Sequence, residues 1–168
     1  MRFFALILVF VSISAKSQDS SKVYVRGGYG FYEGINLGAG YNFNKICSTG
    51  IMFGYDNFST KDQETYAVTL YFNYAVFYIR KKTCNKLRYY INGKTIFWQL
   101  TDDYYKWRVL SLVPSAGCGF VISGRMELLL DLGPSFNVVL QNERKTFKEV
   151  GWPYHVMPNA SISLNIRI

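Results

Sequence analysis

The sequence has few of the residues on which most catalytic and metal sites depend. Its 168 residues include a single histidine, His155, and three cysteines, Cys47, Cys84 and Cys118. One imidazole excludes a multi-histidine metal site, and the number and spacing of the cysteines do not suit tetrahedral zinc. No G-x-S-x-G or comparable nucleophile motif accompanies His155. We therefore expect no catalytic residue, no metal ligand and no cofactor.

Long apolar runs are also missing. The longest extends over residues 3–11, whereas a membrane-spanning helix needs about 20 apolar residues. The chain is nevertheless 49% hydrophobic and 18% aromatic, which a disordered chain would not reach. If this protein crosses a membrane, it therefore crosses with strands.

The N-terminus has the pattern of a secretory signal peptide. Arg2 supplies a positive charge, residues 3–13 are apolar, and Ala15-Lys16-Ser17 fits a small-x-small cleavage site. We expect residues 1–17 to be removed on export, leaving one domain over 18–168. Without that segment, the formal charge falls from +8 to about +6. An exported basic protein points to anionic lipid headgroups rather than to nucleic acid.

The end of the chain alternates strictly between apolar and polar residues. Every even position from Val156 to Ile168 is apolar, and the odd positions between them are polar except Met157. A period of two over this length predicts a strand with two different faces, long enough to cross a bilayer obliquely. Similar alternation predicts further strands at 22–31, 35–43, 48–58, 66–79, 107–122 and 126–140.

Residues 86–100 fit the pattern less well, because Asn92-Gly93 is also typical of a hairpin turn. Either a strand ends there and a long loop follows, or one strand continues through a bulge. We favour a single strand with an irregular outer end, which brings the total to eight. The connections then divide into short turns at 44–47, 80–86 and 123–125 and outer loops at 32–34, 57–65, 99–106 and 141–155.

Glu127 and Asp131 determine which face of the strands meets lipid. Both carboxylates lie on the polar face of the strand 126–140, and charged groups inside a membrane are tolerated only towards a protein interior. The sequence therefore predicts an all-β, eight-stranded, antiparallel, up-and-down transmembrane barrel with a polar lumen.

This pattern resembles the small eight-stranded outer-membrane barrels, the OmpX-like and OmpA-transmembrane-like proteins, with PorT-like barrels as relatives. The resemblance covers about residues 20–168 and includes the segments 112–120 (LVPSAGCGF) and 130–136 (LDLGPSF). It implies an integral, monomeric outer-membrane protein surrounded by membrane lipids.

Four charged residues are candidates for an ionic network that plugs the lumen. Pairing of the last two strands places Glu127 near Arg167 and Asp131 near Ser163, and closure by the first strand brings Arg26 towards Asn165. The lumen of an eight-stranded barrel is just wide enough to be filled by side chains. We therefore expect Arg26, Glu127, Asp131 and Arg167 to form this network, with an ion or proton path as the alternative.

Three further features are candidate sites. Cys47 and Cys84 fall in neighbouring inner turns and are candidates for a disulfide in an oxidising compartment. Basic residues gather in two clusters, which are candidates for contacts with lipopolysaccharide or phospholipid headgroups, although plain solvation of the loops is the alternative we favour for both. The outer cluster is Arg144, Lys145 and Lys148, and the inner one is Arg80, Lys81, Lys82, Lys86 and Arg88.

The leading functional hypothesis is a non-enzymatic outer-membrane protein that contributes to envelope integrity or surface interaction through its outer loops. The second is an accessory component of an envelope assembly or secretion machine, as PorT-like barrels are. A rim-active hydrolase using His155 and a soluble lipocalin-like barrel are further alternatives. The last would require the apolar strand faces to point inward.

Overall fold

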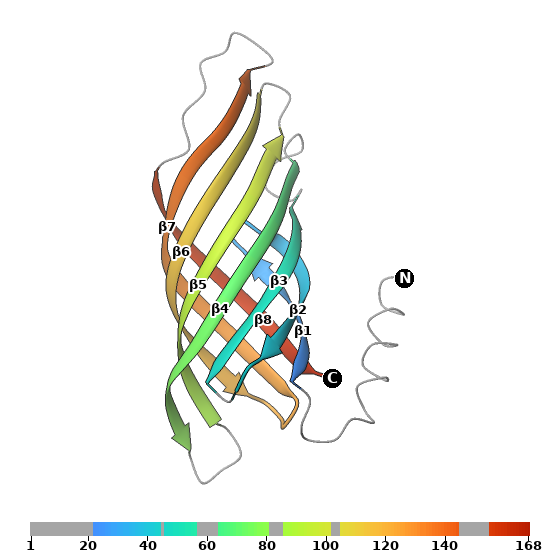
Figure 1. Ribbon diagram of the computed structural model, residues 1–168, viewed down its shortest axis with the longest axis vertical. Coiled ribbons are helices and arrows are strands. Elements are labelled where there is room, and N and C mark those ends of the chain that lie inside the picture. The colour runs from blue at the N-terminus through green and yellow to red at the C-terminus, as the bar shows by residue number, and fades with distance from the viewer. Residues whose placement is uncertain (1–21, 45, 57–63, 81–85, 102–104, 145–154) are drawn as a thin grey trace.

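Eight antiparallel strands form one closed barrel in which each strand pairs with its sequence neighbour and β1 closes the ring against β8 (Figure 1). The computed structural model describes residues 22–44, 46–56, 64–80, 86–101, 105–144 and 155–168. The predicted fold class is confirmed, and the predicted signal peptide, 1–17, lies outside the described residues. The strands are β1 (Val23–Gly30), β2 (Gly34–Asn42), β3 (Cys47–Asp56), β4 (Glu64–Arg80), β5 (Lys86–Thr101), β6 (Tyr105–Val121), β7 (Met126–Arg144) and β8 (Val156–Arg167).

Two of the predicted short turns are closed by a polar side chain. The Asn44 side-chain oxygen accepts hydrogen bonds from the backbone N–H groups of Ile46 and Cys47, at 2.8 and 2.7 Å. The Ser123 hydroxyl oxygen accepts from the N–H groups of Arg125 and Met126. We call this side of the barrel, which also holds the start of β1 and the end of β8, the turn end, and the opposite side the loop end.

Asn92 and Gly93 lie inside β5 and do not form a hairpin turn. Asn92 is in register with Asn73 of β4 and Ser115 of β6, and pairing with both neighbours is regular as far as Thr101. The prediction of a single strand is confirmed, but its irregular outer end is not found. Register shifts instead occur at Ala75/Phe77 and at Arg108/Val109.

The two faces of the barrel differ as the alternation predicts. Inward side chains include buried charged, amide and hydroxyl groups, whereas outward side chains are apolar and exposed, up to 67% for Leu132. This polarity is the reverse of a soluble barrel, so the lipocalin-like alternative is wrong and the barrel is a transmembrane one. We call the outward apolar surface the belt; it includes Leu37, Phe53, Leu70, Phe77, Ile91, Phe97, Leu112, Leu132, Val138 and Ile162.

The belt ends below the tips of β5, β6 and β7. Phe97, Leu110 and Val138 share one row across these strands, and the next outward row is Gln99, Arg108 and Gln141. Arg108 donates hydrogen bonds to both glutamine side chains, from Nε to Gln99 at 3.2 Å and from Nη1 to Gln141 at 2.5 Å. Because this row is polar on the outward face, the strand ends above it extend beyond the hydrocarbon layer, where β7 reaches furthest in Figure 1.

The inward faces of β2 and β3 contain two glycines, Gly40 and Gly50, in one row with large side chains on the strands beside them, Tyr24 of β1 and Tyr71 of β4. Tyr71 of β4 is 2% exposed and fills this space. A Cβ atom at Gly40 or Gly50 would overlap the Tyr71 hydroxyl, and one at Gly50 would also meet the Ala39 carbonyl. These two glycines therefore make the space that the Tyr71 ring occupies.

The β1–β2 turn, residues 31–33, depends on a third glycine. Gly34 has φ of +59°, the left-handed region that other residues rarely adopt. A Cβ there would also overlap Tyr55 and Asp56 of β3. This tight reversal brings Tyr32 and Glu33 back into the barrel, where both are buried.

We predict that Gly50→Val lowers the free energy of unfolding by about 1–3 kcal/mol, because the added atoms must displace Tyr71 or the backbone of β2. Gly93→Val is the matched control, since a Cβ at Gly93 meets no atom within 4 Å, and we expect a change within about 0.5 kcal/mol. Urea unfolding in detergent, followed by tryptophan fluorescence, measures both. Equal losses in the two variants would contradict the close fit at Tyr71.

Candidate functional site

The centre of the lumen holds a cluster of charges around Asp131. Its Oδ2 atom lies 3.3 Å from Lys94 Nζ and 3.5 Å from Arg26 Nη2, and Oδ1 accepts a hydrogen bond from the Asn92 amide. The Ser161 hydroxyl donates to Oδ2 at 3.2 Å and accepts from Lys94 at 2.6 Å. We call Arg26, Asn92, Lys94, Asp131 and Ser161 the central cluster. It joins strands β1, β5, β7 and β8 across the lumen.

Arg26 is fully buried, with 0% of its surface exposed. Its Nε donates to the Ser163 hydroxyl at 2.9 Å, and its guanidinium lies 4.4 Å from the centre of the Tyr71 ring. Cation–π contact with a desolvated ring contributes up to about 2 kcal/mol. Tyr71 thus stabilises a charge that only one carboxylate, Asp131, otherwise balances among the described residues.

Sequence reasoning identified two members of this cluster, Arg26 and Asp131, and the structure brings them into contact. Arg26 lies opposite Asn165, as predicted. Asp131 lies opposite Ser161 rather than Ser163, a displacement of two residues along β8. The period of two specifies which face a residue is on, and a shift of two residues leaves that face unchanged.

Lys94 was missed for a different reason. It follows Asn92-Gly93, and the irregular strand end expected after that pair left the faces of the residues beyond it unassigned. Once β5 is read as one strand, Asn92, Lys94, Ile96 and Trp98 all point inward. A lysine on the inward face, 3% exposed, was the available signal for a partner of Asp131.

A second charged group lies nearer the turn end. Glu127 accepts a hydrogen bond from the Tyr90 hydroxyl at 2.6 Å and lies 3.7 Å from Arg88 Nη1. The side chain of Arg88 is 17% exposed and points into the lumen. Its predicted place in a headgroup-binding cluster was therefore wrong, because it occupies the inward face of β5. Arg80, Lys81, Lys82 and Lys86 have no described side chain.

Arg167 does not take the place predicted for it beside Glu127. Glu127 is in register with Asn165, and Arg167 is in register with Tyr24 of β1. No ion pair links Arg167 with another residue in the described ranges. The cause is the same as for Asp131 and Ser163: the observed register of β8 differs from the predicted one by two residues.

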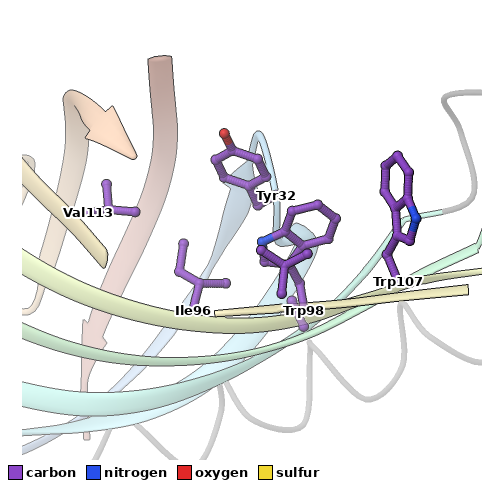
Figure 2. Packing of buried hydrophobic residues seen from close by; sticks show 7 residues of the cluster. Tyr32, Ile96, Trp98, Trp107 and Val113 are labelled. Carbon is purple, nitrogen blue, oxygen red and sulfur yellow. The ribbon is translucent and has the colours of Figure 1, made fainter. Parts of the chain in front are cut away.

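The lumen towards the loop end holds a group of packed aromatic and aliphatic side chains. Tyr32 stacks on Trp98 with 5.4 Å between ring centres, and Ile96 and Val113 lie beside them (Figure 2). Trp98 Nε1 donates to the Ser111 hydroxyl at 2.8 Å, which satisfies the polar atom of the ring. We call the buried residues of this group the aromatic cap: Tyr32, Ala67, Ile96, Trp98, Trp107, Val109 and Val113.

Sequence reasoning did not identify the aromatic cap or Glu33. The signal for the cap was the change of the inward positions of β5 and β6 from polar to apolar. Glu33 is 1% exposed, and neither carboxylate oxygen has a hydrogen-bond partner among the described residues. A buried carboxylate without a partner destabilises the folded state, unlike Asp131.

The remaining candidates lie apart from the lumen charges. Among the described residues, Cys47 and Cys118 take part in no disulfide. Cys47 pairs with Tyr74 of β4, which continues for about 20 Å to Arg80, and Cys84 lies outside the described residues, so the disulfide stays a prediction. Lys145 and Lys148 also lie outside the described residues, as does the side chain of Arg144. The lipopolysaccharide contacts therefore also stay a prediction.

His155 is exposed at the start of β8, where its carbonyl accepts a hydrogen bond from the Asn137 N–H at 2.7 Å. Within the described ranges, no three histidine, cysteine or acidic side chains group as metal ligands would. The described residues include no helix that is long and apolar enough to cross a bilayer.

We predict that Asp131→Asn lowers the free energy of unfolding by about 3–5 kcal/mol, because it leaves Arg26 and Lys94 buried without a counter-charge. Arg167→Gln is the control, with an expected change below about 1 kcal/mol. Guanidinium unfolding in detergent measures both. If Arg167→Gln cost as much as Asp131→Asn, the assignment of the charged partners would be wrong.

Neutralising the buried carboxylate of Glu33 should stabilise the folded protein, the opposite of the effect expected at Asp131. Glu33→Gln keeps the size of the side chain and removes a charge with no described partner, so it should raise the midpoint of unfolding. The same titration measures this change beside Asp131→Asn. A lower midpoint for Glu33→Gln would show that the carboxylate is paired in the folded protein.

Comparison with known proteins gives likeness of architecture only. No family model and no curated protein matches the chain. Among solved structures, Neisserial surface protein A (NspA) is 11% identical, with a TM-score of 0.48, over 88% of this chain and 98% of that one. CarO of Acinetobacter baumannii is 8% identical, with a TM-score of 0.41, over 91% and 100%. A de novo designed protein, TMB2.3, is 19% identical, with a TM-score of 0.43, over 90% and 98%.

Proposed function

We propose that this protein is a non-enzymatic integral protein of the outer membrane whose barrel is a sealed anchor and not a pore. The observation that carries the proposal is the series of buried side chains along the lumen. Arg88 and Glu127, the central cluster and the aromatic cap follow one another from the turn end to the loop end. An eight-stranded barrel has just enough interior for such side chains, so no continuous water path is needed to solvate its charges.

The apolar belt supports a membrane location. Outward phenylalanine, leucine and isoleucine side chains surround the barrel. An apolar surface of this extent would cause the protein to aggregate in water. A closed sheet leaves no unpaired strand edge within the belt, as a bilayer requires. The predicted signal peptide is consistent with export to an outer membrane.

The function would then reside in the strand ends that extend beyond the bilayer. At the loop end, β7 continues from Phe136, its last residue in register with β8, to Arg144. The polar row Gln99, Arg108 and Gln141 braces this extension. We propose that it presents a surface for contacts that contribute to envelope integrity or to surface interaction.

A second candidate function, an accessory role in envelope assembly or secretion, rests on the opposite end. β4 continues past Tyr74, which pairs with β3, to Arg80, and this extension pairs with β5 alone. If the turn end is periplasmic, this hairpin is placed for contact with a periplasmic partner. Deleting residues 145–154 should abolish the effect of a surface binder and leave an assembly factor active, whereas shortening the β4–β5 hairpin should do the reverse.

We predict that the purified protein gives no steady conductance steps in planar lipid bilayers, because on this proposal the three layers of inward side chains leave no continuous water path. A porin of known conductance in the same bilayers is the positive control. Trp98→Ala tests the cap separately and should also remain closed, since the central cluster persists below it. Porin-like conductance of the unmodified protein would contradict the sealed lumen.

A further inference from the structure

The belt is hollowed on one side by a groove of about 700 Å³. It follows two neighbouring rows of outward residues that run across five strands, β5, β6, β7, β8 and β1. One row is Tyr89, Cys118, Leu130, Ile162 and Tyr29; the other includes Ala116, Leu132, Ala160 and Phe31. The volume is in the range of small-molecule pockets.

Small residues form the floor of this groove. Ala116, Cys118 and Ala160 contribute short side chains, whereas many other outward positions of the belt hold leucine, isoleucine, tyrosine or phenylalanine. Tyr89 lies near the turn end of β5 and Tyr29 near the loop end of β1. The groove therefore crosses the belt obliquely, from one end of the barrel towards the other.

A row of prolines borders the groove. Pro114, Pro134 and Pro158 share one level on β6, β7 and β8. Proline has no N–H to donate, and between the pairs Leu112↔Phe136 and Ala116↔Leu132 the described residues of β6 and β7 are not paired, although the register is the same on both sides. The hollow thus lies beside this interruption, over pairs that are regular.

We propose that this groove is a binding site for the acyl chain of a bilayer lipid. The proposal rests on the membrane location put forward above. The outward side chains of the groove are almost all apolar, so a polar ligand would find little to bond with. A hollow inside the hydrocarbon layer must be filled, and an aliphatic chain is the matching shape and chemistry.

A second copy of this chain fits the groove less well than an acyl chain. Two copies related by a two-fold axis present the same patch to each other, so the groove would face another groove and leave a void. The cysteine in its floor, Cys118, reports on this arrangement, because two such thiols would approach each other across the axis.

The test uses the full barrel in vesicles of phosphatidylcholine that contain a trace of phosphatidylcholine with a diazirine in one acyl chain. After irradiation, mass spectrometry maps the labelled residues. We expect at least threefold more label on Leu130, Leu132 and Ile162 than on Leu37, Phe53 and Leu70, which are as exposed but lie outside the groove.

Ala160→Phe fills the groove and should lower its labelling to the level of the rest of the belt. Ala39→Phe is the matched control, because Ala39 is also exposed on the outward face but does not line the groove, and it should change nothing. Heat-modifiable gel mobility verifies folding, and Cys118→Phe replaces Ala160→Phe if that variant does not fold.

Even labelling around the belt, or groove labelling that persists in the folded filled variant, would overturn the acyl-chain site and leave the membrane-spanning barrel intact. A Cys118–Cys118 disulfide formed by oxidant in vesicles would also overturn it, in favour of a second copy. Label on no part of the belt would overturn the membrane location as well.

Discussion

The closure of eight strands into a ring is the constraint on which the rest of this structure depends. It leaves no unpaired backbone edge in the bilayer, and it also limits the lumen to a width that side chains can fill. Each inward residue therefore competes for space with the other inward residues around it. Gly40 and Gly50 are the counterpart of Tyr71, because a large side chain on one strand requires small ones in the same row on the strands beside it.

Filling the lumen with charge is stable only where the charges balance. Asp131 satisfies this condition by contacting Lys94 and Arg26 together, while Tyr71 and Ser163 take up other parts of the guanidinium. Neutral hydrogen bonds from Asn92 and Ser161 complete the carboxylate. Apolar packing takes over towards the loop end, where the aromatic cap needs no counter-charges. Inward side chains change from charged to apolar along the lumen. Fewer buried charges therefore need a partner than if the whole lumen were lined with charged residues.

The strands and their faces could be predicted from the sequence because alternation is a local property. Glu127 and Asp131 were enough to orient every strand, since two inward carboxylates exclude the opposite assignment. Contacts between strands could not be predicted in the same way. A strand can shift by two residues against its neighbour while each side chain keeps its face. The observed register of β8 differs from the predicted one by such a shift, so Arg167 does not lie opposite Glu127, and Ser163 does not lie opposite Asp131. Lys94 and the aromatic cap were not predicted, because Asn92-Gly93 is typical of a turn. In the structure, pairing with strands on both sides overrides this local signal.

The lumen and the groove share one stretch of wall. Gly117 lies between Ala116 and Cys118, and a Cβ there would overlap Asp131 on the inner side. Asp131 and Ser161 of the central cluster border the groove itself. Small residues in β6 thus serve both faces, since they admit the carboxylate inside and leave the hollow outside. A bulky substitution at 117 would act on the ion cluster, whereas one at 116 or 118 would act on the groove. Successive residues of β6 therefore contribute to two different sites, the central cluster on the inner face and the groove on the outer face.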